Sequence, residues 1–205
     1  MKRMKKNNSS FDKSRNNSGE NSYESLDNMK IDEPIIKEPL EDLDNNLRNK
    51  YELLICFVGE DAIRKIFSKF IYYKEEGFNI LKIKVKEIIF EQKNTSEANK
   101  YIVLLMDIVF IFLDDRHPSI VSNSLDVFSL ILKAIEEKSK ENNISYDFTI
   151  TKKILNKIKE KLNDISKKVR TKAAELYCLM LNTDFCEYNT LLIELIENEV
   201  PYFPS

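Results

Sequence analysis

The residues that could do chemistry are few and stand far apart in this chain. His117 is the only histidine, and Cys56, Cys178 and Cys186 form no C-x-x-C pair. A zinc site or a hydrolase triad needs such side chains at close spacing. A phosphate-binding loop needs several neighbouring glycines, whereas the three glycines here are widely separated. We therefore predict a protein that is not an enzyme and has no cofactor, metal or small-molecule substrate.

Basic residues concentrate between Thr151 and Lys172. This stretch holds nine lysines and arginines against two acidic residues, while residues 173–205 hold six acidic residues and no lysine or arginine. A basic surface can bind an acidic protein or a nucleic acid, but a solvated helix face has the same composition. Because the net charge of the whole chain is −2, we do not expect nucleic acid as the partner.

Two segments bear on the location of the protein. The basic N-terminal stretch, MKRMKKNNSS, is not followed by an apolar region, so it does not resemble a secretory signal. The most apolar run, from Ile102 to Leu113, has twelve residues, whereas a bilayer requires about 20. We expect no membrane span and a cytoplasmic protein. The run predicts a core helix, apolar nearly all the way round and placed between other helices, with a polar edge at Asp107.

Composition divides the chain into residues 1–45 and 46–205. The first part is rich in Asn, Ser and charged residues and poor in apolar ones, which predicts a disordered tail. The second part has apolar residues at helical spacing, with Asn94 as a candidate helix cap and Pro118 suited to a first helical position. The predicted helices are Val58–Ser68, Tyr72–Glu91, Ser96–Leu113, Ser119–Glu141, Ile150–Leu162, Lys167–Leu181 and Tyr188–Asn198.

Three of these helices align as an internal repeat. Gly77, Ser124 and Ala173 fall in one column, at offsets of 47 and 49 residues, and apolar residues follow in register one, three and four positions later. A small residue lets the neighbouring helix approach closely, so a large residue at Ala173 should be the most damaging change. Paired helices with a period of about 40 to 50 residues are typical of HEAT and armadillo repeats. We predict an all-α, HEAT/armadillo-like helical repeat stack, with an irregular helical bundle as the alternative.

Stacked helical pairs place equivalent turns along one edge, which makes the turns candidate binding sites. The predicted turns are residues 68–72, 114–118 and 163–168. At least two of the four residues from Phe70 to Tyr73 should be core, because four exposed apolar or aromatic neighbours would be a liability. The cysteines are expected to be small core residues, and Cys178 is expected within the buried face of its helix, which Val169, Ala173, Leu176 and Met180 mark.

Several motifs carry a resemblance to a known family. They are the F-x-G-E entry at Phe57, Gly59 and Glu60, the Ser68-Lys69 turn, and the K-E-E-G segment that begins at Lys74. Together with NDISKKVRTKAAELYCLM further along, they resemble a TOG domain, the tubulin-binding HEAT array of microtubule regulators. The likeness extends over roughly residues 50–200. It implies tubulin or microtubules as the partner, and a place on the cytoskeleton at a centriole, basal body or cilium tip.

The resemblance also implies which side chains touch tubulin, through aromatic and basic groups on the aligned turns. The family's first turn usually presents a Trp, but this chain has none, and Phe70 or Ile71 takes the place. Loss of that flat anchor removes a typical hot-spot group. The implied contacts are Lys69, Phe70, Ile71 and Lys74 from the first turn, Arg116 and His117 from the second, and Lys167, Lys168 and Arg170 from the third.

Each of these residues can also be explained without a role in binding. Lys152–Lys161 is better explained as a solvated helix face, whereas Lys167, Lys168 and Arg170 stand at a repeat turn. His117 is better explained as a polar turn residue before Pro118 than as a partner contact. For the whole chain, the alternative is a generic HEAT/armadillo-type adaptor that holds a peptide or helix in a groove and has no affinity for tubulin.

Overall fold

The structure is a computed structural model that describes residues 38–142 and 152–181 of the 205-residue chain. Within these residues it contains helices and no strand, in agreement with the predicted all-α fold. The predicted helix Tyr188–Asn198 and most of the predicted tail lie outside the described residues. The helices are α1 (Asn45–Lys50), α2 (Glu52–Val58), α3 (Glu60–Ile66), α4 (Ile71–Phe90), α5 (Thr95–Phe112), α6 (Pro118–Asn142), α7 (Lys152–Leu162) and α8 (Lys167–Leu181).

The helices from α4 to α8 begin and end near the predicted residues. Asn94 caps α5 as predicted, because its side chain accepts a hydrogen bond of 2.9 Å from the backbone N–H of Glu97. Pro118 is the first residue of α6, also as predicted. These ends follow from short-range backbone chemistry, which is why the sequence alone locates them.

The entry to the fold differs from the prediction of one helix over Val58–Ser68. Helix α2 ends at Val58 and α3 begins at Glu60, because Gly59 between them has a φ of 84°. That backbone conformation suits glycine and interrupts a right-handed helix. Residues 38–44, which the composition assigns to the tail, also contact the helices. Leu43 is buried, and the Arg64 side chain donates a hydrogen bond of 3.0 Å to the carbonyl of Leu40. The helical domain therefore begins before residue 46.

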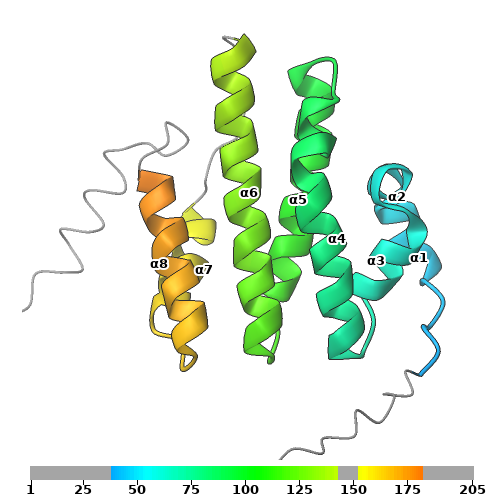
Figure 1. Cartoon of the computed structure of the whole chain (residues 1–205), viewed down its shortest axis with the longest axis horizontal. Coiled ribbons are helices and arrows are strands. Elements are labelled where there is room, and N and C mark those ends of the chain that lie inside the picture. Colours follow the sequence, from blue (N-terminus) through cyan, green and yellow to red (C-terminus); the bar gives the residue numbers. More distant parts are fainter. Residues whose placement is uncertain (1–37, 143–151, 182–205) are drawn as a thin grey trace, which may run out of the picture. The chain divides into compact units, whose positions relative to one another are not determined.

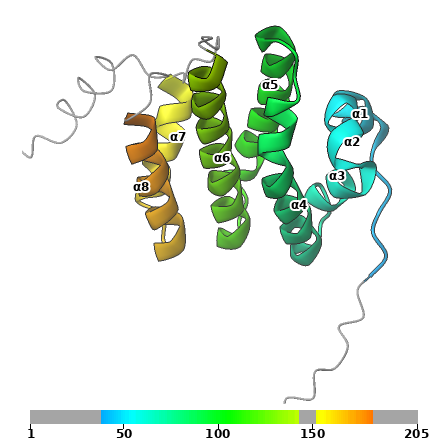
Figure 2. The ribbon, with the colours of Figure 1, turned by 45° about the horizontal axis from the view of Figure 1, so that its top comes forward.

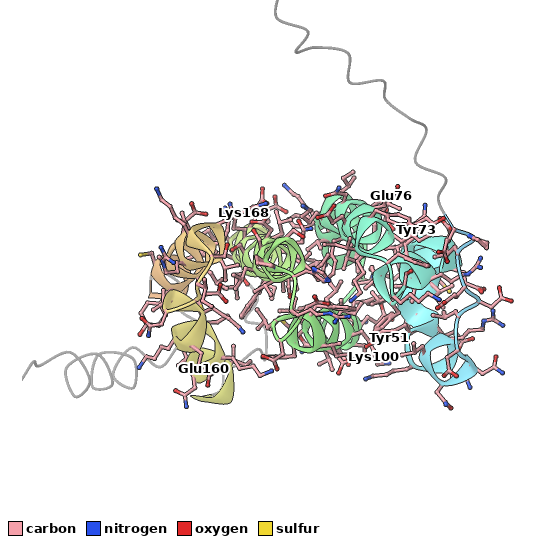
Figure 3. The ribbon with its side chains drawn as sticks, turned by 90° about the horizontal axis from the view of Figure 1, so that it is seen from below. Tyr51, Tyr73, Glu76, Lys100, Glu160 and Lys168 are labelled. Atoms are coloured by element: carbon pink, nitrogen blue, oxygen red, sulfur yellow. The ribbon has the colours of Figure 1, made fainter. Side chains whose placement is uncertain are left out.

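Consecutive helices form hairpins that stack side by side. Helix α3 packs on α4, α5 on α6, and α7 on α8, while α4 packs on α6 and α6 on α8. In Figures 1 and 2, α4, α6 and α8 lie next to one another in one layer. The view in Figure 3 separates this layer from a second one that contains α5 and α7. The predicted HEAT-like stack is confirmed.

The column of small residues is buried, and at two of its positions the contact is with the other helix of the same hairpin. Gly77 leaves no room for a side chain, because a Cβ there would lie 2.7 Å from the backbone nitrogen of Ile66. Ser124 is fully buried, and its hydroxyl donates a hydrogen bond of 2.7 Å to the carbonyl of Val109. Ala173 is fully buried as well. All three positions are buried, in agreement with the repeat register read from the sequence.

Helix α5 does not lie between other helices on all sides, as its composition suggests. Val103 is 65% exposed and Ile111 is 44% exposed, so the outer face of this helix is open and partly apolar. The predicted polar edge at Asp107 faces the N-terminal helices. Its carboxylate accepts a hydrogen bond from the Tyr51 hydroxyl and forms an ion pair of 2.7 Å with Lys50.

One helix in the described part of the chain is long and apolar enough to span a membrane, judged by length and composition alone. It covers Pro118–Glu141, and 61% of its most apolar window is buried inside the protein. Its side chains supply much of the core, including Leu125, Phe128 and Ile131, each fully buried. The core helix of a folded protein passes the same test of length and composition.

A candidate protein-binding edge

The three predicted turns lie along one edge of the stack. We call this the turn edge and define it by residues 68–74, 114–118 and 163–170. It is the lower edge in Figure 1, and Figure 3 views the molecule from that side, with Tyr73 and Lys168 labelled on it. Each turn joins the two helices of one hairpin, so the regular stacking of the hairpins aligns them.

The first turn presents a cluster of aromatic rings. Phe70 stacks on Tyr72 with ring centroids 5.5 Å apart, and Tyr72 contacts Tyr73 at 4.5 Å. All three rings are half-buried, and Lys69 Nζ lies 5.0 Å from the centroid of the Phe70 ring. Only Ile71 packs against the core. The prediction that at least two of these four residues are core is therefore wrong, because the rings shield one another at the surface.

Lys74 is a structural group and not an exposed contact. Its Nζ lies 2.6 Å from Asp115 Oδ2, and the two side chains are only 17% and 9% exposed. Burial raises the pKa of Asp115, but hydrogen bonds from Lys74 and from the backbone N–H of His117 outweigh it and hold this pKa below its usual value. The ion pair ties the first hairpin to the second turn, so a partner that contacted Lys74 would have to replace it.

The second turn exposes one basic side chain. Arg116 is exposed and has no ion-pair partner among residues 38–142 and 152–181. His117 is half-buried, and its backbone N–H donates a hydrogen bond of 2.8 Å to Asp115 Oδ1. Asp114 pairs with Lys157 and lies 3.8 Å from Lys161 on α7. Of the two residues predicted here, Arg116 is thus the one free to meet a partner.

The third turn exposes two lysines and an isoleucine. Lys167 and Lys168 are exposed, and neither has an ion-pair partner in the described part of the chain. Arg170 instead braces the turn, since its Nη1 donates hydrogen bonds of 2.8 Å to the carbonyls of Asp164 and Ile165. Ile165 is 100% exposed, and sequence analysis did not single it out. Its position between Asp164 and Ser166 in a predicted turn could have indicated from the sequence that this isoleucine is exposed.

In the described residues, three lysines of the basic stretch from Thr151 to Lys172 form ion pairs with acidic side chains, and they are Lys157, Lys161 and Lys172. Lys157 reaches Asp114, and Lys172 Nζ lies 3.2 Å from Asp126 and 3.1 Å from Glu175. The hydrogen bonds to Glu175 and Asp126 raise the pKa of Lys172. Part of the positive charge therefore holds the stack together, and the part at Lys167 and Lys168 stays available.

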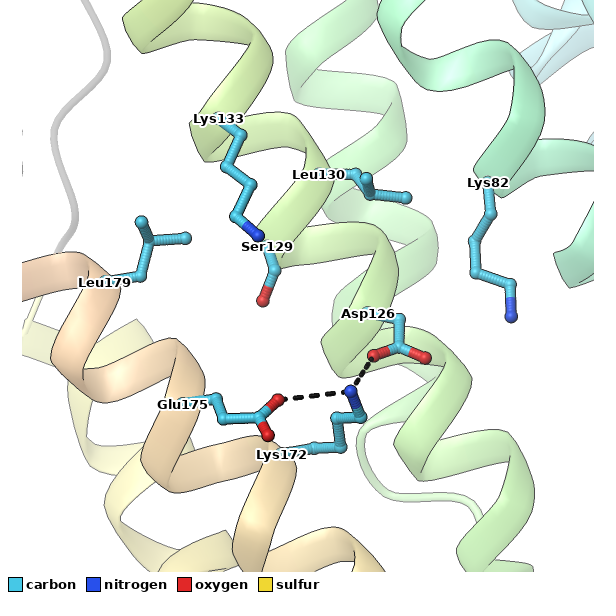
Figure 4. Close-up of a pocket in the computed structure, with 8 residues that line it drawn as sticks. All are labelled: Lys82, Asp126, Ser129, Leu130, Lys133, Lys172, Glu175 and Leu179. Carbon is cyan, nitrogen blue, oxygen red and sulfur yellow. Dashed lines mark hydrogen bonds and ion pairs between the residues drawn. The ribbon is translucent and has the colours of Figure 1, made fainter.

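A groove of about 510 Å³ runs between α6 and α8 in the layer that also contains α4 (Figure 4). Lys172 bridges Asp126 and Glu175 at one end, as the dashed lines show. Lys133 is exposed and has no ion-pair partner in the described ranges, and Lys82 donates to the side chain of Asn123 at 2.9 Å. The lining residues are Lys82, Asp126, Ser129, Leu130, Lys133, Lys172, Glu175 and Leu179.

The cysteines are not core residues where the structure describes them. Cys56 and Cys178 are both exposed, so the expectation for Cys178 is wrong. The inward face of α8 is formed by Val169, Ala173, Leu176 and Met180, as predicted, and Cys178 points away from it. Cys186 lies outside the described residues. No group of three or more His, Cys, Asp or Glu that could hold a metal occurs in the described part.

The geometry defines a class: a HEAT-type helical repeat with its intra-hairpin turns aligned on one edge. The structure is similar to a solved one, the TOG domain of human Cep104, with a TM-score of 0.53 and 14% sequence identity. The match covers 82% of this chain, which spans 64% of the length of that structure. No family model matches the sequence, and no curated protein does. At this identity the likeness concerns the fold, which is TOG-like.

Proposed function

We propose that this chain is a non-enzymatic protein-binding domain that holds tubulin against its turn edge. The observation that carries the proposal is the exposure, on two turns that share this edge, of three basic side chains with no ion-pair partner among the described residues: Arg116, Lys167 and Lys168. Basic groups on a rigid edge steer an acidic partner surface into place and speed its association. The TOG-like fold, which is also that of the Cep104 domain, supports the choice of tubulin.

Apolar groups on the same edge supply the anchors. The half-buried Phe70 ring stands on the first turn in place of the family's Trp, and Ile165 on the third turn is 100% exposed. Anchors of this kind contribute most of the binding energy once water is excluded around them. The proposed contact set is therefore Phe70, Arg116, Ile165, Lys167 and Lys168, while Lys74 and Arg170 hold the turns in shape.

The proposal gives a smaller part in binding to three other predicted residues, Lys69, Ile71 and His117. Lys69 forms an ion pair with Glu41, which a partner would have to replace. Ile71 packs against the core, and His117 is half-buried. We further propose a cytoskeletal location, at a centriole, basal body or cilium tip, where a fluorescent fusion should overlap with tubulin staining.

The test compares two charge-reversal variants that change the net charge equally. Lys167→Glu with Lys168→Glu alters the turn edge, and Lys82→Glu with Lys133→Glu alters the groove between α6 and α8. Size-exclusion chromatography and sedimentation velocity with purified tubulin should show co-migration for the wild type and the groove variant, weakening as salt rises. The edge variant should not co-migrate. Equal binding by all three proteins, or none by the wild type at any salt concentration, contradicts the proposal.

The second candidate function is an adaptor that holds an acidic peptide in the groove of Figure 4. The feature that favours it is the pair Lys82 and Lys133, which line the groove together with the apolar side chains of Leu130 and Leu179. This function predicts the opposite result. The groove variant would lose the chief partner in a pull-down, the edge variant would keep it, and neither would bind tubulin.

A further inference from the structure

A second exposed surface lies away from the turn edge, where α5 meets the start of α2. We call it the outer patch and define it by Glu52, Leu53, Lys100, Val103 and Leu104. These residues line one side of an open groove of about 510 Å³. Figure 3 labels Lys100 in the layer opposite to that of Lys168. Helix α5 begins at the end of the stack that is farther from the turn edge (Figure 1).

The centre of the outer patch is apolar and open to solvent. Val103 is 65% exposed and Leu53 is 43% exposed. On α5, Val103 and Leu104 lie three and four residues after Lys100, which places both of them beside Lys100 on one side of the helix. This side is separate from the buried face of α5, where Ile102 and Leu105 are at most 1% exposed. A folded chain gains from covering such an apolar surface.

Two opposite charges flank this apolar centre. Glu52 and Lys100 are both exposed, and within the described ranges neither forms an ion pair. Their neighbour Lys50 is different, because it pairs with Asp107 at 2.7 Å. An unpaired acid on α2 and an unpaired base on α5 make the patch complementary to itself. Around a two-fold axis, Glu52 of each copy meets Lys100 of the other, and both contacts form at once.

We propose that the outer patch is the interface between two copies of this chain related by a two-fold axis. Leu53 and Val103 of each copy pack at the centre, and the pairs between Glu52 and Lys100 flank them. The charges favour a second copy over an unrelated partner, since they balance within the pair. This arrangement leaves the turn edge of each copy free. The proposed dimer does not depend on whether the turn edge binds tubulin.

The first test is the mass of the full chain in solution, measured by light scattering and sedimentation equilibrium over a concentration series. The wild type should be a dimer that dissociates on dilution, and Val103→Asp should be a monomer. Ile83→Asp is the matched control, because Ile83 on α4 is 78% exposed and lies outside the outer patch. It should leave the dimer unchanged. A wild type that stays monomeric up to about 0.5 mM overturns the proposal, since any dimer would be too weak to matter.

The second test is a charge exchange. Glu52→Lys and Lys100→Glu should each raise the dissociation constant of the dimer by about tenfold, because each places like charges in contact at two equivalent positions. The double variant restores both pairs with their signs exchanged, so it should recover wild-type dimerisation. Circular dichroism of every variant checks that the helices are intact. A dimer that survives Val103→Asp, or a double variant weaker than both single ones, overturns the proposal.

Discussion

Lys74 Nζ on α4 lies 2.6 Å from Asp115 Oδ2 in the turn before α6, and both side chains are largely buried. The two residues are 41 positions apart in the sequence. Lys74 also lies 5.2 Å from the ring centroid of Phe112, so its charge is enclosed by an acid and an aromatic face. This pair joins two consecutive hairpins and fixes the spacing between two of the turns on the edge.

A double-mutant cycle should show that this pair stabilises the fold. We expect Lys74→Met and Asp115→Asn to couple by about 0.5–3 kcal/mol in the free energy of unfolding, because each change leaves a largely buried polar group without its partner. The exposed pair Lys84–Glu87 is the control, with coupling below about 1 kcal/mol. Urea denaturation measures both cycles. Equal coupling in the two cycles would mean that burial of the first pair adds nothing.

The same carboxylate should make the protein sensitive to acid. The pKa of Asp115 is lower in the folded protein than the value of about 3.9 for an unfolded chain. Stability from this group is therefore fully present above about pH 4 and is lost as the pH falls through the folded pKa. The urea midpoint of the wild type should fall more between pH 6 and pH 3 than that of Asp115→Asn. Parallel pH profiles would rule out this contribution.

Two adjacent alanines on α8 offer a matched pair for testing the repeat column. Ala173 is fully buried, and Ala174 is exposed. Ala173→Leu should destabilise the protein by about 1–3 kcal/mol, because a packed interior cannot take the added carbons without strain. Ala174→Leu should change the free energy of unfolding by less than about 0.5 kcal/mol. Similar losses in thermal or urea unfolding would show that the column does not control hairpin packing.

A buried lysine on α6 supports the end of α4. Lys138 is 7% exposed, and its Nζ donates hydrogen bonds of 2.6 Å to the carbonyl of Ile89 and 2.8 Å to that of Gln92. Burial lowers the pKa of Lys138. Lys138→Met should cost about 1–3 kcal/mol in the free energy of unfolding, because carbonyls at the end of α4 lose their donor. Lys133→Met on the exposed side of α6 is the control and should be close to neutral.

Amide hydrogen exchange gives a second readout for the lysine on α6. In Lys138→Met, the last turn of α4 should exchange faster than in the wild type, while the N-terminal half of α4 should be unchanged. Uniform loss of protection along α4 would show that Lys138 acts on the whole hairpin and not on the helix end.

The sequence alone predicts most of the fold, because helix periodicity and helix ends are local properties. Caps such as Asn94 act within a few residues, and the column of Gly77, Ser124 and Ala173 follows from the period of the repeat. Helix periodicity did not predict the break between α2 and α3, although the glycine that causes it, Gly59, is visible in the sequence. A single glycine shows its positive φ only once the chain on both sides is placed.

The tertiary structure decided which charged and apolar groups are available to a partner. From sequence, Lys74, Lys167 and Lys168 look equivalent, yet Lys74 is enclosed by an acid 41 residues away and the other two are exposed. Cys178 and Val103 turned out to be exposed for the same reason, since burial depends on which helices lie on each side. Pairing and burial are set by distances through space between segments far apart in the chain, and periodicity along one helix carries no information about them.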